Sequence, residues 1–209
     1  MARIDRKDWK LFGNVLKDTV NFWTEGGTVS KNAVDPGTDQ EGALRPGLVL
    51  GKSNADGLLY PYGVNFKNGT TTATGDGSTT TFELAHQHLV PFSETVRVGT
   101  TTLVRDVDYK IDYKRGVVEI FEAPANGSSI SITYLYDDVL DGTEIPVGIL
   151  MDYVYIDSGQ GPEDVDVVYV VAGHVYENQI KVVKEASLAF AIHVLSRNFF
   201  GINDPALAL

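Results

Sequence analysis

The passage from Gly142 to Lys181 constrains the fold most, because it holds the longest sustained strand pattern in the chain. Apolar side chains occupy alternate positions across 145–151, so a pleated strand would carry them on one face. The run 165–171 is β-branched or aromatic at nearly every position, which is typical of a strand covered on both faces. The connecting residues are rich in Gly and Pro and too few for a crossover helix. An antiparallel strand pair is therefore predicted at the core of a β domain.

Two elements are predicted beside this pair. Residues 46–64 form a hairpin pattern, in which Leu48 and Leu50 alternate before a turn signal at Asp56–Gly57. In the first core strand the apolar residues occupy odd-numbered positions, whereas the following Val154 and Ile156 occupy even-numbered ones. A bulge or bend is therefore expected near 152–153.

A helix is predicted from about residue 178 to residue 200. Gly201 is suited to the position just past its end, and Pro205 prevents continuation. The apolar residues with helical spacing are Leu188, Ile192, Leu195 and Phe199.

The first 45 residues are expected to lie outside the β domain. Residues 1–24 have helical periodicity, and the following Gly-, Thr- and Asp-rich stretch 26–45 is typical of a linker or extended arm. Large apolar side chains on one helical face could anchor the segment to another protein, or the helix could pack on its own domain. These side chains are Trp9, Phe12, Leu16, Val20 and Trp23.

The segment 64–138 is predicted to be a separate inserted domain. It begins with a Thr- and Gly-rich tract, interpreted as an extended spacer, and continues with short strand patterns separated by turns. The flanking strands should be neighbours, as a tolerated insertion requires, so the segment is interpreted as a projecting knob. The strand patterns cover 80–84, 94–98, 109–113, 117–121 and 129–136.

Composition and charge limit the function classes. The chain has 209 residues, 43% of them hydrophobic, which suits one large domain or two modest ones. Without cysteine it has no disulfide, thiolate metal site or cysteine nucleophile. No apolar run approaches the roughly 20 residues of a membrane helix, and no secretory signal follows the N-terminal charges, so a soluble protein made in a cytoplasm is expected.

The net charge of −11 disfavours a nucleic-acid partner, because phosphate binding needs clustered Lys and Arg. Residues 1–20 contain five basic and three acidic side chains, a local charge of +2. This basic arm could guide docking to an acidic surface, or it could be an ordinary solvated end.

No catalytic, cofactor-binding or metal-ligating set is predicted, and the chain is not expected to be an enzyme. Nucleophile-elbow, zinc-protease and phosphate-loop motifs are absent from the sequence. His86 and His88 could chelate a metal from one face of a strand, but no third ligand has matching spacing, and exposed strand-edge histidines are the other interpretation. Acidic clusters lie in loops without the calcium-loop pattern.

Four phrases in chain order carry a family resemblance: RPGLVLGK, DGLLYPYG, GTEIPVGILMDYV and VVYVVAGHVYENQIK. Together they resemble the head decoration proteins of tailed bacteriophages, similar to the lambda capsid-stabilising protein. The resemblance covers 45–63 and 142–181, and more loosely the C-terminal helix. The chain departs from the pattern in its longer N-terminus and in the segment after Gly63. That segment resembles small β modules inserted in phage structural proteins.

This resemblance implies a mainly β fold. A small β-barrel or β-tulip-like decoration domain with a C-terminal helix would comprise 45–63 and 139–209. An immunoglobulin-like or small β-sandwich domain would interrupt it at 64–138, and 1–44 would be the arm and linker.

The resemblance also implies a structural virion protein on the capsid exterior. It would bind the major capsid protein as a trimer at threefold positions and stabilise the head, with no cofactor, nucleic acid or membrane. Contacts to the capsid or to a neighbouring subunit are assigned to Trp9, Phe12, Leu16 and Trp23.

Two alternatives remain open from the residues. The chain could be a glycan-binding or adhesion module whose inserted domain binds a host-surface glycan. Tyr109, Tyr113 and Phe121 would support this if they were exposed on one face. An enzyme would need a polar pocket with perturbed acids.

Overall fold

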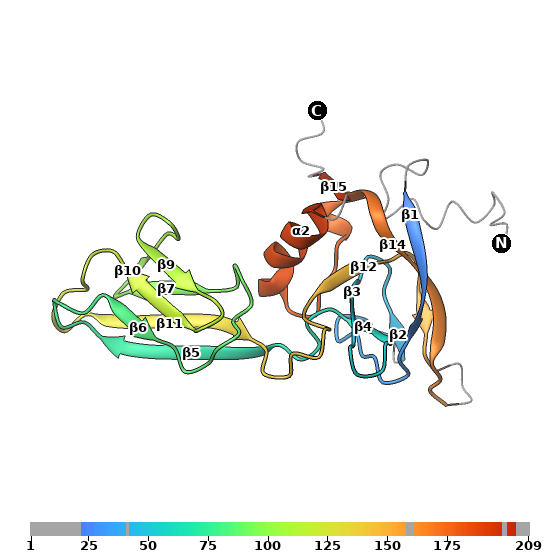
Figure 1. The fold of residues 1–209 in the computed structure, drawn as a ribbon, viewed down its shortest axis with the longest axis horizontal. Coiled ribbons are helices and arrows are strands. Elements are labelled where there is room, and N and C mark those ends of the chain that lie inside the picture. Colours follow the sequence, from blue (N-terminus) through green and yellow to red (C-terminus); the bar gives the residue numbers. More distant parts are fainter. Residues whose placement is uncertain (1–21, 41, 158–160, 198–199, 204–209) are drawn as a thin grey trace. The chain divides into compact units, whose positions relative to one another are not determined.

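The computed structural model describes residues 22–40, 42–157, 161–197 and 200–203. The protein is mainly β, and its contacts divide it into two compact units (Figure 1). The described residues of Met1–Val64 and Leu140–Leu209 form one, the barrel unit. Residues Asn65–Val139 form the other, the inserted unit.

Five strands of the barrel unit close into a small barrel. Closure results from β1, which pairs antiparallel with β14 on one side and parallel with β4 on the other. The remaining neighbours, β4–β3, β3–β12 and β12–β14, are antiparallel. The strands are β1 (Trp23–Val29), β3 (Val49–Lys52), β4 (Leu59–Pro61), β12 (Pro146–Leu150) and β14 (Val165–Tyr176).

Shorter elements complete this unit. β2 (Ala43–Leu44) and β13 (Val154–Tyr155) form a separate two-stranded sheet, and β15 (Phe200–Asn203) runs parallel to the end of β14. Two 3-10 turns, η1 (Glu177–Gln179) and η2 (Glu185–Ser187), precede the helix α2 (Leu188–Arg197).

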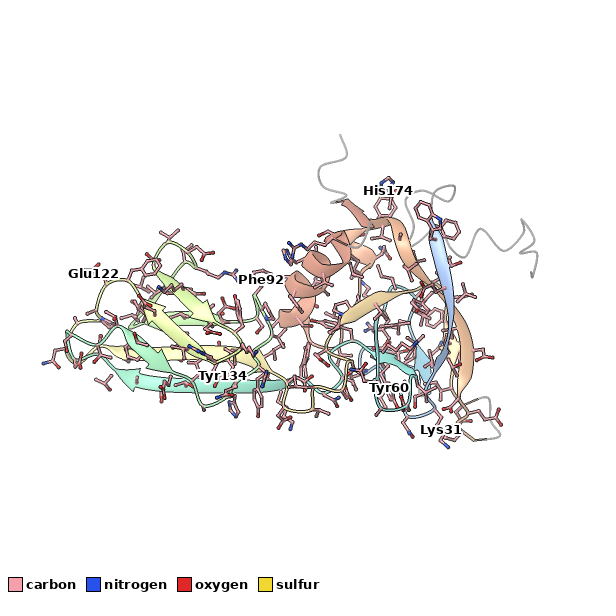
Figure 2. The ribbon with its side chains drawn as sticks, in the orientation of Figure 1. Lys31, Tyr60, Phe92, Glu122, Tyr134 and His174 are labelled. Atoms are coloured by element: carbon pink, nitrogen blue, oxygen red, sulfur yellow. The ribbon has the colours of Figure 1, made fainter. Side chains whose placement is uncertain are left out.

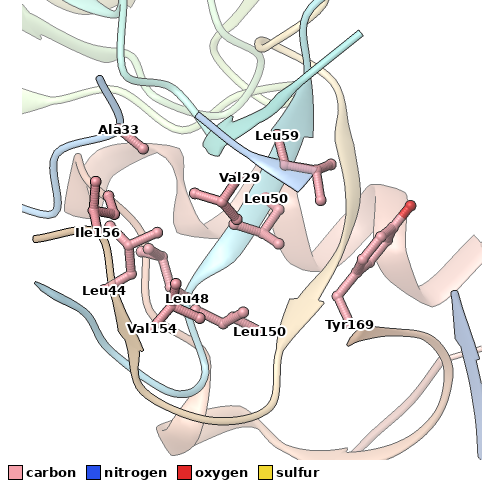
Figure 3. Packing of buried hydrophobic residues seen from close by; sticks show 10 residues of the cluster. All are labelled: Val29, Ala33, Leu44, Leu48, Leu50, Leu59, Leu150, Val154, Ile156 and Tyr169. Carbon is pink, nitrogen blue, oxygen red and sulfur yellow. The ribbon is translucent and has the colours of Figure 1, made fainter. Parts of the chain in front are cut away.

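The barrel interior is a continuous apolar cluster of Val29, Ala33, Leu44, Leu48, Leu50, Leu59, Leu150, Val154, Ile156 and Tyr169 (Figure 3). The neighbouring Ile149 and Val170 are also fully buried, but strand alternation turns them to the outer face. α2 packs against β12 and β15 and buries Ala191 and Leu195. The predicted antiparallel core pair, the small barrel and a C-terminal helix are thus confirmed.

Details of the core strands differ from expectation. Ile145 is exposed and lies just before β12, and the register of β12 against β3 shifts between Pro146 and Gly148. Pro146 lacks the N–H that a regular ladder requires, which accounts for an irregularity there. Within 165–171, β14 is covered on both faces only from Tyr169 onward, since Asp166 and Val168 are exposed. The bend expected at 152–153 is the point where the chain leaves the barrel for β13.

The linker predicted over 26–45 is wrong. β1 pairs with β14 along its whole length, and the following loop buries Ala33, Ala43 and Leu44. The glycines suit the close packing, because a side chain at Gly27 would collide with Leu59 and Tyr169. The stretch is therefore a barrel strand and a packed loop.

The C-terminal helix is shorter than predicted, ending at Arg197. Gly201 is not a helix cap but lies in β15, opposite His174 of β14. The helix was expected to reach residue 200, but Phe200 instead begins strand β15, which pairs with β14. Phe199 and Pro205 lie outside the described residues.

The inserted unit contains two sheets around one apolar cluster. One sheet has the order β5-β11-β7-β8 and the other β6-β10-β9. Buried side chains from both sheets, among them Val96, Val118 and Ile132, meet in that cluster. The strands are β5 (Lys67–Thr74), β6 (Thr81–Glu83), β7 (Thr95–Val98), β8 (Thr101–Thr102), β9 (Tyr109–Asp112), β10 (Val117–Ile120) and β11 (Ser129–Tyr136).

All five strands predicted in this segment are present, but the Thr- and Gly-rich tract is not a spacer. It contributes β5, which pairs with β11 over eight residues. Threonine is β-branched and suits a half-exposed strand. Gly69 leaves room for the ring of Tyr134 directly opposite.

We expect Gly47→Ala to destabilise the barrel unit more than Gly57→Ala. Both glycines have positive φ (85° and 75°), so both variants bear the backbone strain of a left-handed residue, about 1 kcal/mol. Only at Gly47 would the new methyl group also collide with the carbonyl of Gln179, while the space around Gly57 is open. Urea unfolding measures the difference, and equal losses would contradict the predicted collision.

Candidate interaction surfaces

Trp23 lies at one end of the barrel, where it begins β1 opposite Ala172 of β14. Its side chain is 67% exposed. Further along the same ladder, Val168 is 50% exposed, and its partner Gly26 has open space in place of a side chain. The exposed residues Trp23, Gly26 and Val168 are called here the Trp23 strip, and the exposed polar residues Thr24 and Glu25 lie between Trp23 and Gly26. The strip ends at a polar contact in which Thr28 Oγ1 donates to Asp166 at 2.7 Å.

The structure corrects the predicted helical face at this point. Trp23 is a strand residue, so the helix expected over 1–24 does not extend to it. Trp9, Phe12, Leu16 and Val20 lie outside the described residues. Of the four predicted interaction residues, only Trp23 can therefore be placed, and it is exposed in the way a contact residue requires.

An open cleft of about 610 Å³ lies at the other end of β1. Figure 2 shows Lys31, which lines it, and His174, close to the partner of Trp23, at opposite ends of the barrel unit. The cleft is formed by the loop after β1 and the segment after β13. Its lining residues are Lys31, Ala33, Val34, Asp35, Thr38, Gln40, Gly42, Ala43, Ile156, Asp157 and Pro162.

A buried ion pair holds the wall of this cleft. The side chain of Asp35 is fully buried and accepts two hydrogen bonds from Arg45, from Nε at 2.6 Å and from Nη2 at 2.8 Å. Backbone N–H groups of Gly37 and Arg45 donate to the same carboxylate. Gly37 must be glycine here, because a Cβ would overlap the guanidinium. The Asp35 carboxylate therefore stabilises the loop after β1, and its hydrogen bonds are made within the protein.

Two tyrosines stand beside the cleft. Tyr153 and Tyr155 are 47% and 54% exposed, and their rings stack with centroids 6.4 Å apart and planes within 23°. The Tyr155 hydroxyl donates to Gln40 Oε1 at 3.1 Å, so the pair is attached to the cleft wall. Sequence reasoning missed this pair, although the alternation in DYVYID was a usable signal, since residues two apart share a strand face.

Tyr109, Tyr113 and Phe121 do not form the exposed aromatic face that would have supported a glycan-binding inserted domain. Tyr109 is buried, and Tyr113 contributes to the edge of the same core. Both hydroxyls donate to Glu94 Oε1 at 3.1 Å, and Arg105 approaches that oxygen at 3.4 Å. Burial raises the pKa of both phenols, and the negative charge of Glu94 raises them further. Phe121 alone of the three predicted residues is an exposed aromatic.

This Glu94 network serves the fold. The side chain of Glu94 is 98% removed from solvent, with Oε1 satisfied and Oε2 without a hydrogen-bond partner among the described residues. The guanidinium of Arg105 lies 4.4 Å from the ring centroid of Phe92 and also donates to the Tyr113 hydroxyl. A buried carboxylate balanced by an adjacent guanidinium and two phenols is a typical structural cluster.

The histidines predicted to share a strand face lie instead in the loop after β6. His86 stacks on Tyr136 with centroids 3.7 Å apart, and its Nδ1 lies 3.1 Å from the Tyr134 hydroxyl. His88 has a φ of 52° and bonds through its backbone to Lys114 and Asp137. These contacts assign His86 a packing role.

A groove of about 510 Å³ opens on the inserted unit around Leu103, Val107, Ile120 and Phe121. Val107 and Phe121 are exposed. Val98, which lines this groove, pairs with Ile130 near the start of β11. Tyr136, at the other end of β11, pairs with Lys67, close to where the chain enters and leaves the inserted unit.

Across the described residues, no three His, Asp or Glu side chains lie close enough together to hold a metal ion. Within the same residues, no helix has the length and hydropathy needed to cross a membrane. The described residues offer contact surfaces and a polar cleft.

Comparison with known proteins gives one relative of limited extent. The uncharacterized protein MJ0340 of Methanocaldococcus jannaschii is similar to this chain, with 35% identity over 88 residues. The matched region is 41% of this chain and 37% of that protein, so the chain spans little more than a third of the relative's length. No protein-family model and no solved structure matches the chain.

Proposed function

We propose that this protein is a structural virion protein of a tailed bacteriophage. It binds the exterior of the capsid through the major capsid protein and stabilises the head, as a trimer at threefold positions. One observation carries the proposal: the four phrases that resemble the decoration family contain strands β3, β4, β12 and β14 of one closed barrel. Motifs scattered over 45–181 therefore belong to a single domain, as the resemblance requires.

The position of the inserted unit supports the same proposal. In the barrel unit, the backbone N–H of Gly63 donates to the carbonyl of Thr143 at 3.3 Å, so the points of departure and return are adjacent. In the inserted unit, Lys67 pairs with Tyr136, which brings its ends together as well. Such an insertion leaves the barrel intact. We take this unit as a small, immunoglobulin-like sandwich that projects outward from the head.

The Trp23 strip is the proposed contact with the capsid or a neighbouring subunit. Trp23 and Val168 are both exposed on the β1–β14 ladder, and aromatic anchors dominate many interfaces. A β-tulip-like barrel of modest size would also gain stability by burying apolar surface in a trimer. The local positive charge of residues 1–20 adds attraction to an acidic capsid surface.

Location in the particle tests the function directly. In the proposed function, the protein is made in the host cytoplasm and then added to the capsid. Cryo-electron microscopy of the parent phage is expected to show this chain as density at threefold positions on the outside of the head. Density in the tail, or absence from purified particles, would contradict the proposal.

We expect Trp23→Ala to weaken binding to undecorated heads by about thirtyfold or more, since truncating a buried interface aromatic costs about 2–4 kcal/mol. The side chain is mostly exposed in the free protein, so the melting temperature should hardly change. Head occupancy across a concentration series measures the effect. Phe121→Ala, which removes an aromatic side chain of 50% exposure from the inserted unit, is the matched control and should bind normally. Full occupancy by Trp23→Ala would remove this residue from the contact.

A further inference from the structure

The cleft beside β13 combines a flat aromatic surface with fixed polar groups. The stacked rings of Tyr153 and Tyr155 present about half of their area to solvent. The Tyr155–Gln40 bond holds one ring against the cleft, and the backbone N–H of Gln40 donates to Thr38 Oγ1 at 3.2 Å. Gln40 therefore connects the Tyr155 ring to Thr38 of the cleft wall through contacts within the protein.

The polar groups of the cleft alternate between donors and acceptors. The Lys31 ammonium and the Gln40 amide nitrogen can donate, while the Asp157 carboxylate is an acceptor that receives the backbone N–H of Gly161 at 3.3 Å. Between them, Ala43 and Ile156 supply an apolar floor. A ligand with many hydroxyl groups and one apolar face matches this lining.

Charge around the cleft argues against an anionic ligand. Asp157 lines the cleft, and Glu163 and Asp164 follow closely in the chain. The Asp164 carboxylate accepts from the backbone N–H of Lys31 at 2.7 Å, which places it beside the cleft wall. The carboxylate of Asp35 is already paired with Arg45. Phosphate or uronate groups would meet this excess of carboxylates.

We propose that this cleft binds a neutral oligosaccharide. The C–H face of a pyranose ring would stack on an outer face of the Tyr153–Tyr155 pair, and its hydroxyls would bond with Gln40, Lys31 and Asp157. Aromatic rings favour contact with polarised C–H groups over their faces, and a few placed polar groups set orientation in such sites. The site lies at the opposite end of β1 from Trp23, the proposed capsid anchor, so it does not depend on capsid attachment.

A proline-rich peptide is the competing ligand, because extended peptides of this kind also dock on paired aromatic rings. The lining favours the sugar. Side chains from two loops supply an ammonium, an amide and a carboxylate within one cleft, whereas proline offers no N–H and few polar groups to satisfy them.

Saturation-transfer NMR on the full chain tests the inference with defined probes. The panel is maltotetraose, cellotetraose, tetra-N-acetylchitotetraose, and manno- and galacto-configured tetrasaccharides, with a proline-rich decapeptide as the competitor. At least one sugar should receive saturation and shift the ring signals of Tyr153 and Tyr155. Tyr155→Ala should weaken that binding by about tenfold, the size expected for one lost aromatic contact. Tyr155→Phe keeps the ring and should lose less.

Two controls make each result decisive. Phe121→Ala removes an exposed aromatic of the inserted unit and should leave sugar binding unchanged. Thermal melting of Tyr155→Ala should match the parent chain, because the side chain is half exposed and its strand pairing is a backbone contact. The inference is overturned if no sugar in the panel binds, if the decapeptide binds instead, or if both Tyr155 variants bind sugar as well as the parent.

Discussion

Asp35→Ala should lower the free energy of unfolding of the barrel unit by about 3 kcal/mol, the lower end of the cost of removing one partner from a buried ion pair. The substitution leaves the Arg45 guanidinium, whose side chain is only 23% exposed, without its carboxylate. It also removes the acceptor used by the backbone N–H groups of Gly37 and Arg45. Urea unfolding followed by tryptophan fluorescence measures the loss.

An exposed ion pair elsewhere in the chain provides the control. Lys67 contacts Asp138 at 2.8 Å, but both side chains are about half exposed. Lys67→Ala should therefore cost much less than Asp35→Ala, because solvent screens an exposed ion pair. Arg45→Ala should be about as damaging as Asp35→Ala, and the double variant should lose less than the sum, because each single change leaves a buried charge unpaired. A loss for Asp35→Ala no larger than that for Lys67→Ala would show that the pair does not hold the loop.

Ile132→Ala should destabilise the inserted unit by about 2–5 kcal/mol and leave the barrel unit unaffected. Ile132 is 1% exposed, lies in the middle of β11 between β5 and β7, and belongs to the cluster shared by both sheets. Truncation to alanine loses buried apolar area and leaves a cavity. The two units have separate apolar clusters, so the damage should stay in one of them.

Hydrogen exchange measured by mass spectrometry resolves the two units within the intact chain. For Ile132→Ala, peptides from β5, β7 and β11 should lose protection, while those from β3, β12 and β14 should keep it. Leu50→Ala is the reciprocal variant, since Leu50 is fully buried in the barrel cluster. Its effect should be confined to the barrel unit. Equal loss of protection in both units for either variant would mean that they unfold as one cooperative body.

Local chemistry in the sequence was sufficient for the strands with dense apolar or aromatic character. The β12–β14 pair, the β3–β4 hairpin and β9 to β11 were predictable because their side chains alternate and Gly, Asn or Asp marks the turns between them. The predicted separation of 64–138 likewise rested on a visible change in composition.

The strands β1 and β5 were beyond such reasoning. Both are rich in Gly and Thr, so neither carries an apolar periodicity of its own. Their extended state depends on backbone hydrogen bonds to β14 and β11, which lie more than 50 residues away in the chain. Context of this kind overrides weak local preference, because strand stability comes mainly from the neighbouring strand.

For the candidate surfaces too, some features could be predicted from the sequence and others depended on the tertiary structure. The sequence alone identified Trp23 as an aromatic outside the expected core, but helical spacing suggested the wrong element for it. It could not separate the buried Tyr109 from the exposed Phe121, because both lie in or beside strands with similar composition. Only the tertiary structure decided which tyrosines reach solvent, since exposure depends on what the opposing sheet covers. The bond from Tyr155 to a glutamine 115 positions away exists only once the chain has folded.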